Sequence, residues 1–150
     1  MTDEAPNSSP VSIGMRLPSL MFLTRPLREF LALSLKARGF DEEWIEEFGL
    51  AVTELVNNSF EHASPSEWHE VAVDLTIHPD RVEFRIRDEG EGAITQADFD
   101  FEGKGPPDHF EDRGRGLFLI SCFSDDVIVQ EAEEGGTAVT ITKFRGGMER

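Results

Sequence analysis

The stretch AVTELVNNSFEHA, residues 51–63, decides how this sequence is interpreted. Its apolar residues recur at helical spacing, which predicts an amphipathic helix with one buried stripe. Glu54, Asn58 and His62 are spaced by four, so they stack on the opposite side of that helix. One interpretation of this row is an ordinary solvated face. The other is a functional site, in which the Asn58 carbonyl oxygen suits a hard cation such as Mg²⁺ and the Glu54 carboxylate positions or deprotonates a nucleophile.

The ends of this helix are predicted by local signals. Asp41 is a good N-cap, and the acidic residues 42 and 43 that follow it are favoured by the helix dipole. The helix is expected to run to about His62, before residues 64 and 65 break it. An earlier amphipathic helix is expected to end near Arg38, before a glycine C-cap, with Pro26 either in its first turn or kinking a longer helix.

Alternation of apolar and polar residues predicts strands on both sides of these helices. Residues 93–113 are polar, acidic and rich in Pro and Gly, which predicts a long functional or mobile loop. The order strand, two helices, two strands, loop, helix, two strands predicts an α+β fold, with helices on one face of a mostly antiparallel sheet. The predicted strands cover residues 11–17, 71–77, 82–86, 127–129 and 138–142, and the last helix lies around residues 117–123.

Charge and composition exclude several classes of protein. The 150 residues include 30 acidic and 14 basic ones, a net charge of −16, which argues against binding of duplex nucleic acid or of an anionic membrane. A single cysteine, Cys122, excludes an internal disulfide and a multi-cysteine zinc site. The first ten residues lack the basic and apolar segments of a signal peptide, so a cytoplasmic protein is expected.

Two glycine motifs follow predicted elements at places where a ligand can approach the backbone. In IRDEGEGA, residues 86–93, a strand ends in Asp88-x-Gly90-x-Gly92, where the carboxylate can accept a hydrogen bond from an exocyclic amine. In DRGRGLFLI, residues 112–120, Gly114-x-Gly116 opens an apolar helix, whose free N–H groups form an anion site. Taken alone, either motif is equally an ordinary flexible turn.

Two further features support the glycine motifs. Arg113 and Arg115 flank Gly114 and can add charge-assisted contacts to an anion. Gly136-Thr137 opens the last predicted strand, where the hydroxyl can face a bound base or a bridging water. Each feature is modest by itself, but their joint order and spacing are specific.

In this order the four motifs resemble those of the GHKL, or Bergerat-fold, ATP-binding superfamily. Glu54-x-x-x-Asn58 is similar to its N box, and the motifs that begin at Asp88, Gly114 and Gly136 are similar to its G1 box, G2 box and final Gly-Thr pair. Within the superfamily the chain most resembles the small anti-sigma-factor serine/threonine kinases. The resemblance covers residues 11–145 and implies a two-layer Bergerat-fold sandwich, with tails at residues 1–10 and 146–150.

The resemblance implies a role for each matching residue. Asp88 is expected to accept from the adenine amino group, helped through water by Thr137, and Glu54 is the expected general base. Asn58 is expected to ligate Mg²⁺, and residues 93–113 to form a lid. The other expected ATP-binding residues shape the base pocket or cradle the phosphates: Gly90, Gly92, Arg113, Gly114, Arg115, Gly116 and Leu117.

The function implied is phosphoryl transfer from ATP to a partner protein. A kinase of this type holds a sigma factor and phosphorylates an anti-anti-sigma, STAS-type antagonist, and it is expected to be a homodimer. Two alternatives stay open: a nucleotide-gated binding module that transfers no phosphate, and a stand-alone histidine-kinase-like ATPase domain. Glu54 favours the kinase, because a pure binding module needs only Asp88, the glycines and Asn58.

Overall fold

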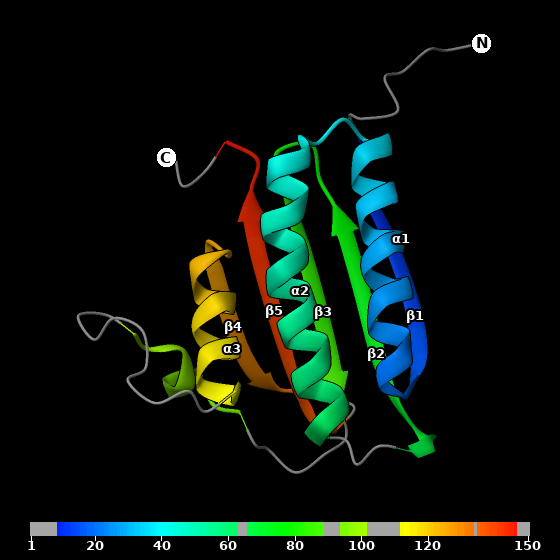
Figure 1. Ribbon diagram of the computed structural model, residues 1–150, viewed down its shortest axis with the longest axis vertical. Coiled ribbons are helices and arrows are strands. Elements are labelled where there is room, and N and C mark those ends of the chain that lie inside the picture. Colours follow the sequence, from blue (N-terminus) through cyan, green and yellow to red (C-terminus); the bar gives the residue numbers. More distant parts are fainter. Residues whose placement is uncertain (1–8, 63–65, 89–93, 102–111, 134, 147–150) are drawn as a thin grey trace.

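The structure is a computed structural model that describes residues 9–62, 66–88, 94–101, 112–133 and 135–146. Its strands form one sheet in the order β1-β2-β3-β5-β4, in which every neighbouring pair is antiparallel. Helices α1, α2 and α3 cover one face of that sheet (Figure 1). The predicted α+β fold is therefore confirmed. The strands are β1 (Val11–Ser19), β2 (Ser66–Ile77), β3 (Arg81–Asp88), β4 (Asp126–Glu131) and β5 (Thr137–Phe144), and the helices are α1 (Thr24–Ala37), α2 (Glu42–His62) and α3 (Asp112–Cys122).

The core lies between the helices and the covered face of the sheet. Along β2 and β3 the buried residues alternate with more exposed ones, so one face of each strand is apolar. The opposite face carries polar cross-strand pairs such as Asp74 and Arg85, whose charged groups lie 3.6 Å apart. Helix α2 lies between α1 and α3 (Figure 1), and many of its residues are buried. The largest fully buried side chains include Phe48, Phe60, Phe84, Leu31, Leu35 and Leu55.

Several element bounds differ from the sequence-based expectations. The strand predicted over residues 71–77 begins at Ser66, and the helix predicted around residues 117–123 begins at Asp112. Pro26 is the third residue of α1, so it kinks nothing: its missing N–H belongs to the first turn, where no helical partner exists.

The segment predicted as a long loop contains a short 3-10 helix, η2 (Gln96–Phe99). Thr95 and Asp98 form a capping box around it, which a search for apolar periodicity over four residues does not detect. The Gln96 side chain pairs with edge strand β4: its Nε2 donates to Val127 O, and Val129 N donates to its Oε1, each at 2.8 Å. The described part of this segment is thus attached to the sheet.

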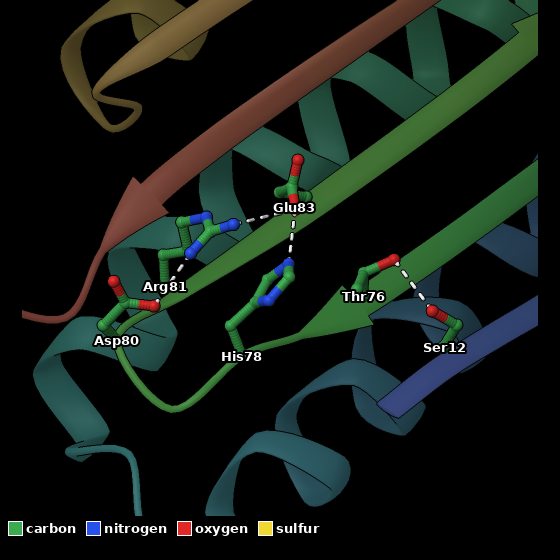
Figure 2. A network of polar contacts seen from close by, with 6 residues as sticks. All are labelled: Ser12, Thr76, His78, Asp80, Arg81 and Glu83. Atoms are coloured by element: carbon green, nitrogen blue, oxygen red, sulfur yellow. Dashed lines mark hydrogen bonds and ion pairs between the residues drawn. The ribbon is translucent and has the colours of Figure 1, made fainter. Parts of the chain in front are cut away.

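At the end of the sheet where β2 turns into β3, a polar network closes the hairpin (Figure 2). His78 Nε2 lies 2.5 Å from Glu83 Oε1, and Arg81 bonds Asp80 at 3.0 Å. Arg145 reaches the same turn, donating to Pro79 O at 3.4 Å. None of the predicted site residues belongs to this turn, and Asp88 lies at the opposite end of β3.

Candidate functional site

Four elements converge at one end of the molecule. In the lower part of Figure 1, α2 and β3 end where α3 and β5 begin. Asp88 is the last residue of β3 and Thr137 the first of β5, and the two are paired across the strands. Two residues that lie 49 positions apart in the sequence are thereby brought together, as the predicted site requires.

Helices α2 and α3 meet closely at Glu54. A β-carbon added to Gly116 would lie 2.8 Å from Glu54 Oε2, a distance that real side chains do not adopt. Glu54 and Gly116 line one polar cavity of about 440 Å³ together with Asn58 and Arg115. The remaining lining residues are Asn57, Glu61 and Leu119.

Asn58 is buried in this cavity wall, with 7% of its surface exposed. Its Oδ1 atom is buried and has no hydrogen-bond partner among the described residues. A buried acceptor left unsatisfied costs about 1–3 kcal/mol, so such an atom needs an explanation. The interpretation of the row as a plain solvated face is therefore wrong for Asn58. A hard cation is a suitable partner for this amide oxygen.

The charges of the cavity are mixed. Glu54 and Glu61 bring two carboxylates, and Arg115 brings one guanidinium. Carboxylates alone would repel a polyphosphate, and a divalent cation between them would remove that repulsion. The donor set therefore fits Mg²⁺ accompanied by phosphates better than phosphates alone. Among the described residues no group of three or more His, Cys, Asp or Glu could hold a metal by itself.

The structure places the other predicted residues in different ways. Gly114 and Gly116 lie within the first turns of α3, and Arg115 is exposed between them. Leu117 is 6% exposed and belongs to the apolar core, so its side chain packs there and is not among the residues that line the cavity. Arg113 belongs to α3, but its side chain lies outside the described residues, as do Gly90, Gly92 and, of the expected lid, residues 93 and 102–111.

Asn57 is a site residue that sequence reasoning missed. Its side chain lines the polar cavity and also a second cavity, between α1 and α2. Thr24 Oγ1, at the start of α1, donates to Asn57 Oδ1 at 2.9 Å and so fixes the amide. The spacing of four that singles out Glu54 and Asn58 skips Asn57, although the adjacent pair of asparagines was a visible signal.

A family model described as a histidine kinase-like ATPase domain matches residues 17–143. The chain is 37% identical over 117 residues to a serine-protein kinase RsbW of Listeria monocytogenes, covering 71% of this chain and 69% of the relative. It is 27% identical over 142 residues to a serine-protein kinase RsbW of Bacillus cereus, covering 88% of this chain and 84% of the relative.

A solved structure also has this fold. It contains the RsbU and RsbW domains of Rv1364c from Mycobacterium tuberculosis, and it matches with a TM-score of 0.59 and 20% identity. The match covers 88% of this chain and 31% of that longer chain, and at this identity it supports the fold alone. In the part of the chain that the structure describes, no helix is long and apolar enough to cross a membrane.

Proposed function

Because the chain belongs to the histidine kinase-like ATPase domain family, we propose that it is an ATP-dependent protein serine/threonine kinase. The relatives named serine-protein kinase RsbW support this reaction class. In the proposed role the protein is a cytoplasmic anti-sigma factor, a homodimer that binds a sigma factor and phosphorylates an anti-anti-sigma antagonist of the STAS type.

One observation carries the proposal: a carboxylate, an unsatisfied amide oxygen and a glycine-lined backbone share one cavity. They are contributed by Glu54, Asn58 and Gly116. Phosphoryl transfer depends mainly on positioning and on neutralising charge, and these groups suit both tasks. A binding module without catalysis would need no carboxylate beside the phosphates.

The adenine ring of ATP is assigned to the end of the sheet where β3 ends and β5 begins. Asp88 offers a carboxylate at the edge of the sheet, and Thr137 lies directly opposite it. A carboxylate selects adenine by accepting from its amino group. The phosphates are assigned to the first turn of α3, which begins at Asp112 and includes Gly114, because the first N–H groups of a helix have no partner within the helix.

Asn58 is the residue of this chain that would hold Mg²⁺, through the amide oxygen that has no partner among the described residues. Bound there, the ion would neutralise the charge of the phosphates next to two carboxylates. Glu54 orients the acceptor hydroxyl of the partner protein and accepts its proton. The tight packing of Gly116 against the Glu54 carboxylate limits the positions that this base can adopt.

The proposal is tested by incubating the protein with Mg²⁺, γ-labelled ATP and a STAS-domain protein of the same organism. Labelled phosphoserine or phosphothreonine on the STAS protein is expected. Glu54→Gln keeps the size of the side chain and removes the base, so transfer should fall by about 10²–10⁴-fold while ATP still binds. Glu43→Gln, on the exposed surface of the same helix and outside the cavity, is the matched control and should transfer phosphate at a rate close to that of the unchanged protein.

Two results would contradict the proposal. Phosphate transfer by Glu54→Gln at the normal rate would contradict the assignment of Glu54 as the general base. ATP binding by the unchanged protein, without transfer to any STAS partner that it binds, would instead favour the nucleotide-gated binding module.

A further inference from the structure

Glu61 lines the polar cavity, and the proposed function leaves it without a role. It lies in the last turn of α2, which ends at His62, and it follows Asn58 by three positions. Its side chain is exposed. In the described part of the chain no ion pair involves it, not even with Arg115, which lines the same cavity. The position therefore holds a negative charge that the described residues do not balance.

The C-terminal end of a helix is an unfavourable place for a carboxylate. The backbone dipole makes this end of α2 partly negative, and the carbonyl groups of the last turn have no partner within the helix. At the other end of α2, Glu42 and Glu43 lie in the first turn, where the same dipole favours them. Glu61 thus adds negative charge to a negative helix end, an arrangement that a bound cation would stabilise.

The row of residues that contains Glu61 also contains the unsatisfied oxygen of Asn58. Residues three or four apart lie on one side of a helix, so Glu54, Asn58 and Glu61 form one row, and all three line the same cavity. The Asn58 side chain is buried, and its Oδ1 atom has no partner within the described chain. This orphaned oxygen is an observation independent of the carboxylates, and it favours the same kind of ligand.

The two carboxylates of the cavity differ in their surroundings. Glu54 packs against α3, where a β-carbon added to Gly116 would lie 2.8 Å from its Oε2, and the proposed function uses it as the base. Glu61 is more exposed. Mg²⁺ in proteins is usually bound by one or two carboxylates together with the phosphates of the nucleotide. An amide oxygen carries no net charge, so Glu61 supplies the charge that Asn58 lacks.

We propose that Glu61 is a second protein ligand of the magnesium ion, which it holds together with Asn58. This inference rests on the proposed function, because the ion is the one that accompanies ATP, and it adds a residue to that site. The same carboxylate repels phosphates that arrive without a cation. Glu61 therefore makes nucleotide binding depend on magnesium more strongly than Asn58 alone would.

The test measures ADP binding to the full chain by calorimetry, once with saturating Mg²⁺ and once with EDTA. Glu61→Gln keeps the size of the side chain and removes its charge. The gain in ADP affinity that Mg²⁺ provides should fall about tenfold. Binding in EDTA should be at least as tight as in the unchanged protein, because a charge that repels the phosphates has been removed.

Glu43→Gln is the matched control. It makes the same change in net charge, on the exposed surface of the same helix and outside the cavity. Both of its ADP affinities should stay within about twofold of those of the unchanged protein. Electron paramagnetic resonance of Mn²⁺ bound with ADP gives a second readout: Glu61→Gln should weaken Mn²⁺ binding about tenfold, and Glu43→Gln should not.

Equal behaviour of the two variants would overturn the proposal, and so would a loss of ADP affinity in Glu61→Gln that is as large in EDTA as in Mg²⁺. Neither measurement requires phosphate transfer. If the expected differences are found in a protein that transfers no phosphate, only the kinase reaction is contradicted. The two proposals therefore fail separately.

Discussion

A β-carbon on Gly116 of α3 would lie 2.8 Å from Oε2 of Glu54 on α2. The two helices thus meet at a point where only glycine leaves the carboxylate in place. The second glycine of the G2-type motif is therefore required because a larger residue would displace the side chain that we propose as the general base. This contact explains physically why a glycine is needed in the interior of a helix, where it otherwise costs about 1 kcal/mol relative to alanine.

We expect Gly116→Ala to reduce phosphate transfer at least tenfold by displacing the Glu54 carboxylate. The free energy of unfolding should change by no more than about 1 kcal/mol, because the better helix propensity of alanine offsets part of the crowding. Single-turnover transfer and urea unfolding measure the two effects. Gly146→Ala is the control, since a β-carbon there meets nothing within 4 Å. Equal transfer by both variants would contradict the close contact.

Asp88→Asn is expected to weaken ATP binding about 10- to 100-fold, because a carboxylate that accepts from the adenine amine is replaced by an amide. The effect should be much smaller for a nucleotide without an amino group at that position, such as ITP. Calorimetry with both nucleotides measures the difference. Asp74→Asn, on the exposed face of β2, should bind both like the unchanged protein. Unaltered ATP affinity in Asp88→Asn would contradict the assignment of the adenine pocket to this end of the sheet.

Asn58→Ala should abolish the effect of magnesium on ATP binding but change the stability of the protein only slightly. Oδ1 has no partner within the described chain, so no hydrogen bond is lost there, and the free energy of unfolding should fall by no more than about 2 kcal/mol. The gain in ATP affinity on adding Mg²⁺ should disappear. Titrations with Mg²⁺ and with EDTA measure this gain, and Asn58→Asp, which keeps an oxygen ligand, should retain it. A magnesium effect of normal size in Asn58→Ala would refute the assignment.

Gln96→Glu should loosen the attachment of η2 to β4. The substitution keeps the acceptor for Val129 N but places a carboxylate oxygen against Val127 O, where an N–H now donates. Because these hydrogen bonds are exposed to solvent, we expect a loss of about 0.5–1.5 kcal/mol in the free energy of unfolding. Hydrogen exchange of the Val129 amide should also become faster. Gln130→Glu, on exposed β4, is the control, and similar losses in both variants would show that added charge alone is responsible.

The helices and the order of elements could be predicted because their signals are local. The cap at Asp41 and the apolar stripe that follows it predict a helix to about His62, and α2 spans Glu42–His62. Asn58 illustrates the limit of such signals. Its spacing places it opposite the apolar stripe, which by itself is equally compatible with a solvated face, but α3 packs against that side of α2 and Asn58 is buried. Burial of this kind depends on neighbours that are distant in the sequence.

The candidate site depends on sheet order in the same way. Asp88 and Thr137 are paired because β5 inserts between β3 and β4, an arrangement that no local pattern in either strand specifies. The family resemblance supplied the expectation that the two residues act together. The contacts of Gln96 and Asn57 were not predicted, since hydrogen bonds made by single polar side chains leave no periodic pattern in a sequence.

The pairing of Gln96 with β4 has a consequence for how copies of this protein can assemble. Strand β4 lies at one border of the sheet, and the Gln96 amide already uses backbone groups of that border, so another chain cannot add a strand there without displacing it. In the part of the chain that the structure describes, the other border is β1. Two copies joined strand to strand would therefore use β1 twice, around a twofold axis, and the assembly would stop at two molecules rather than extend into a filament.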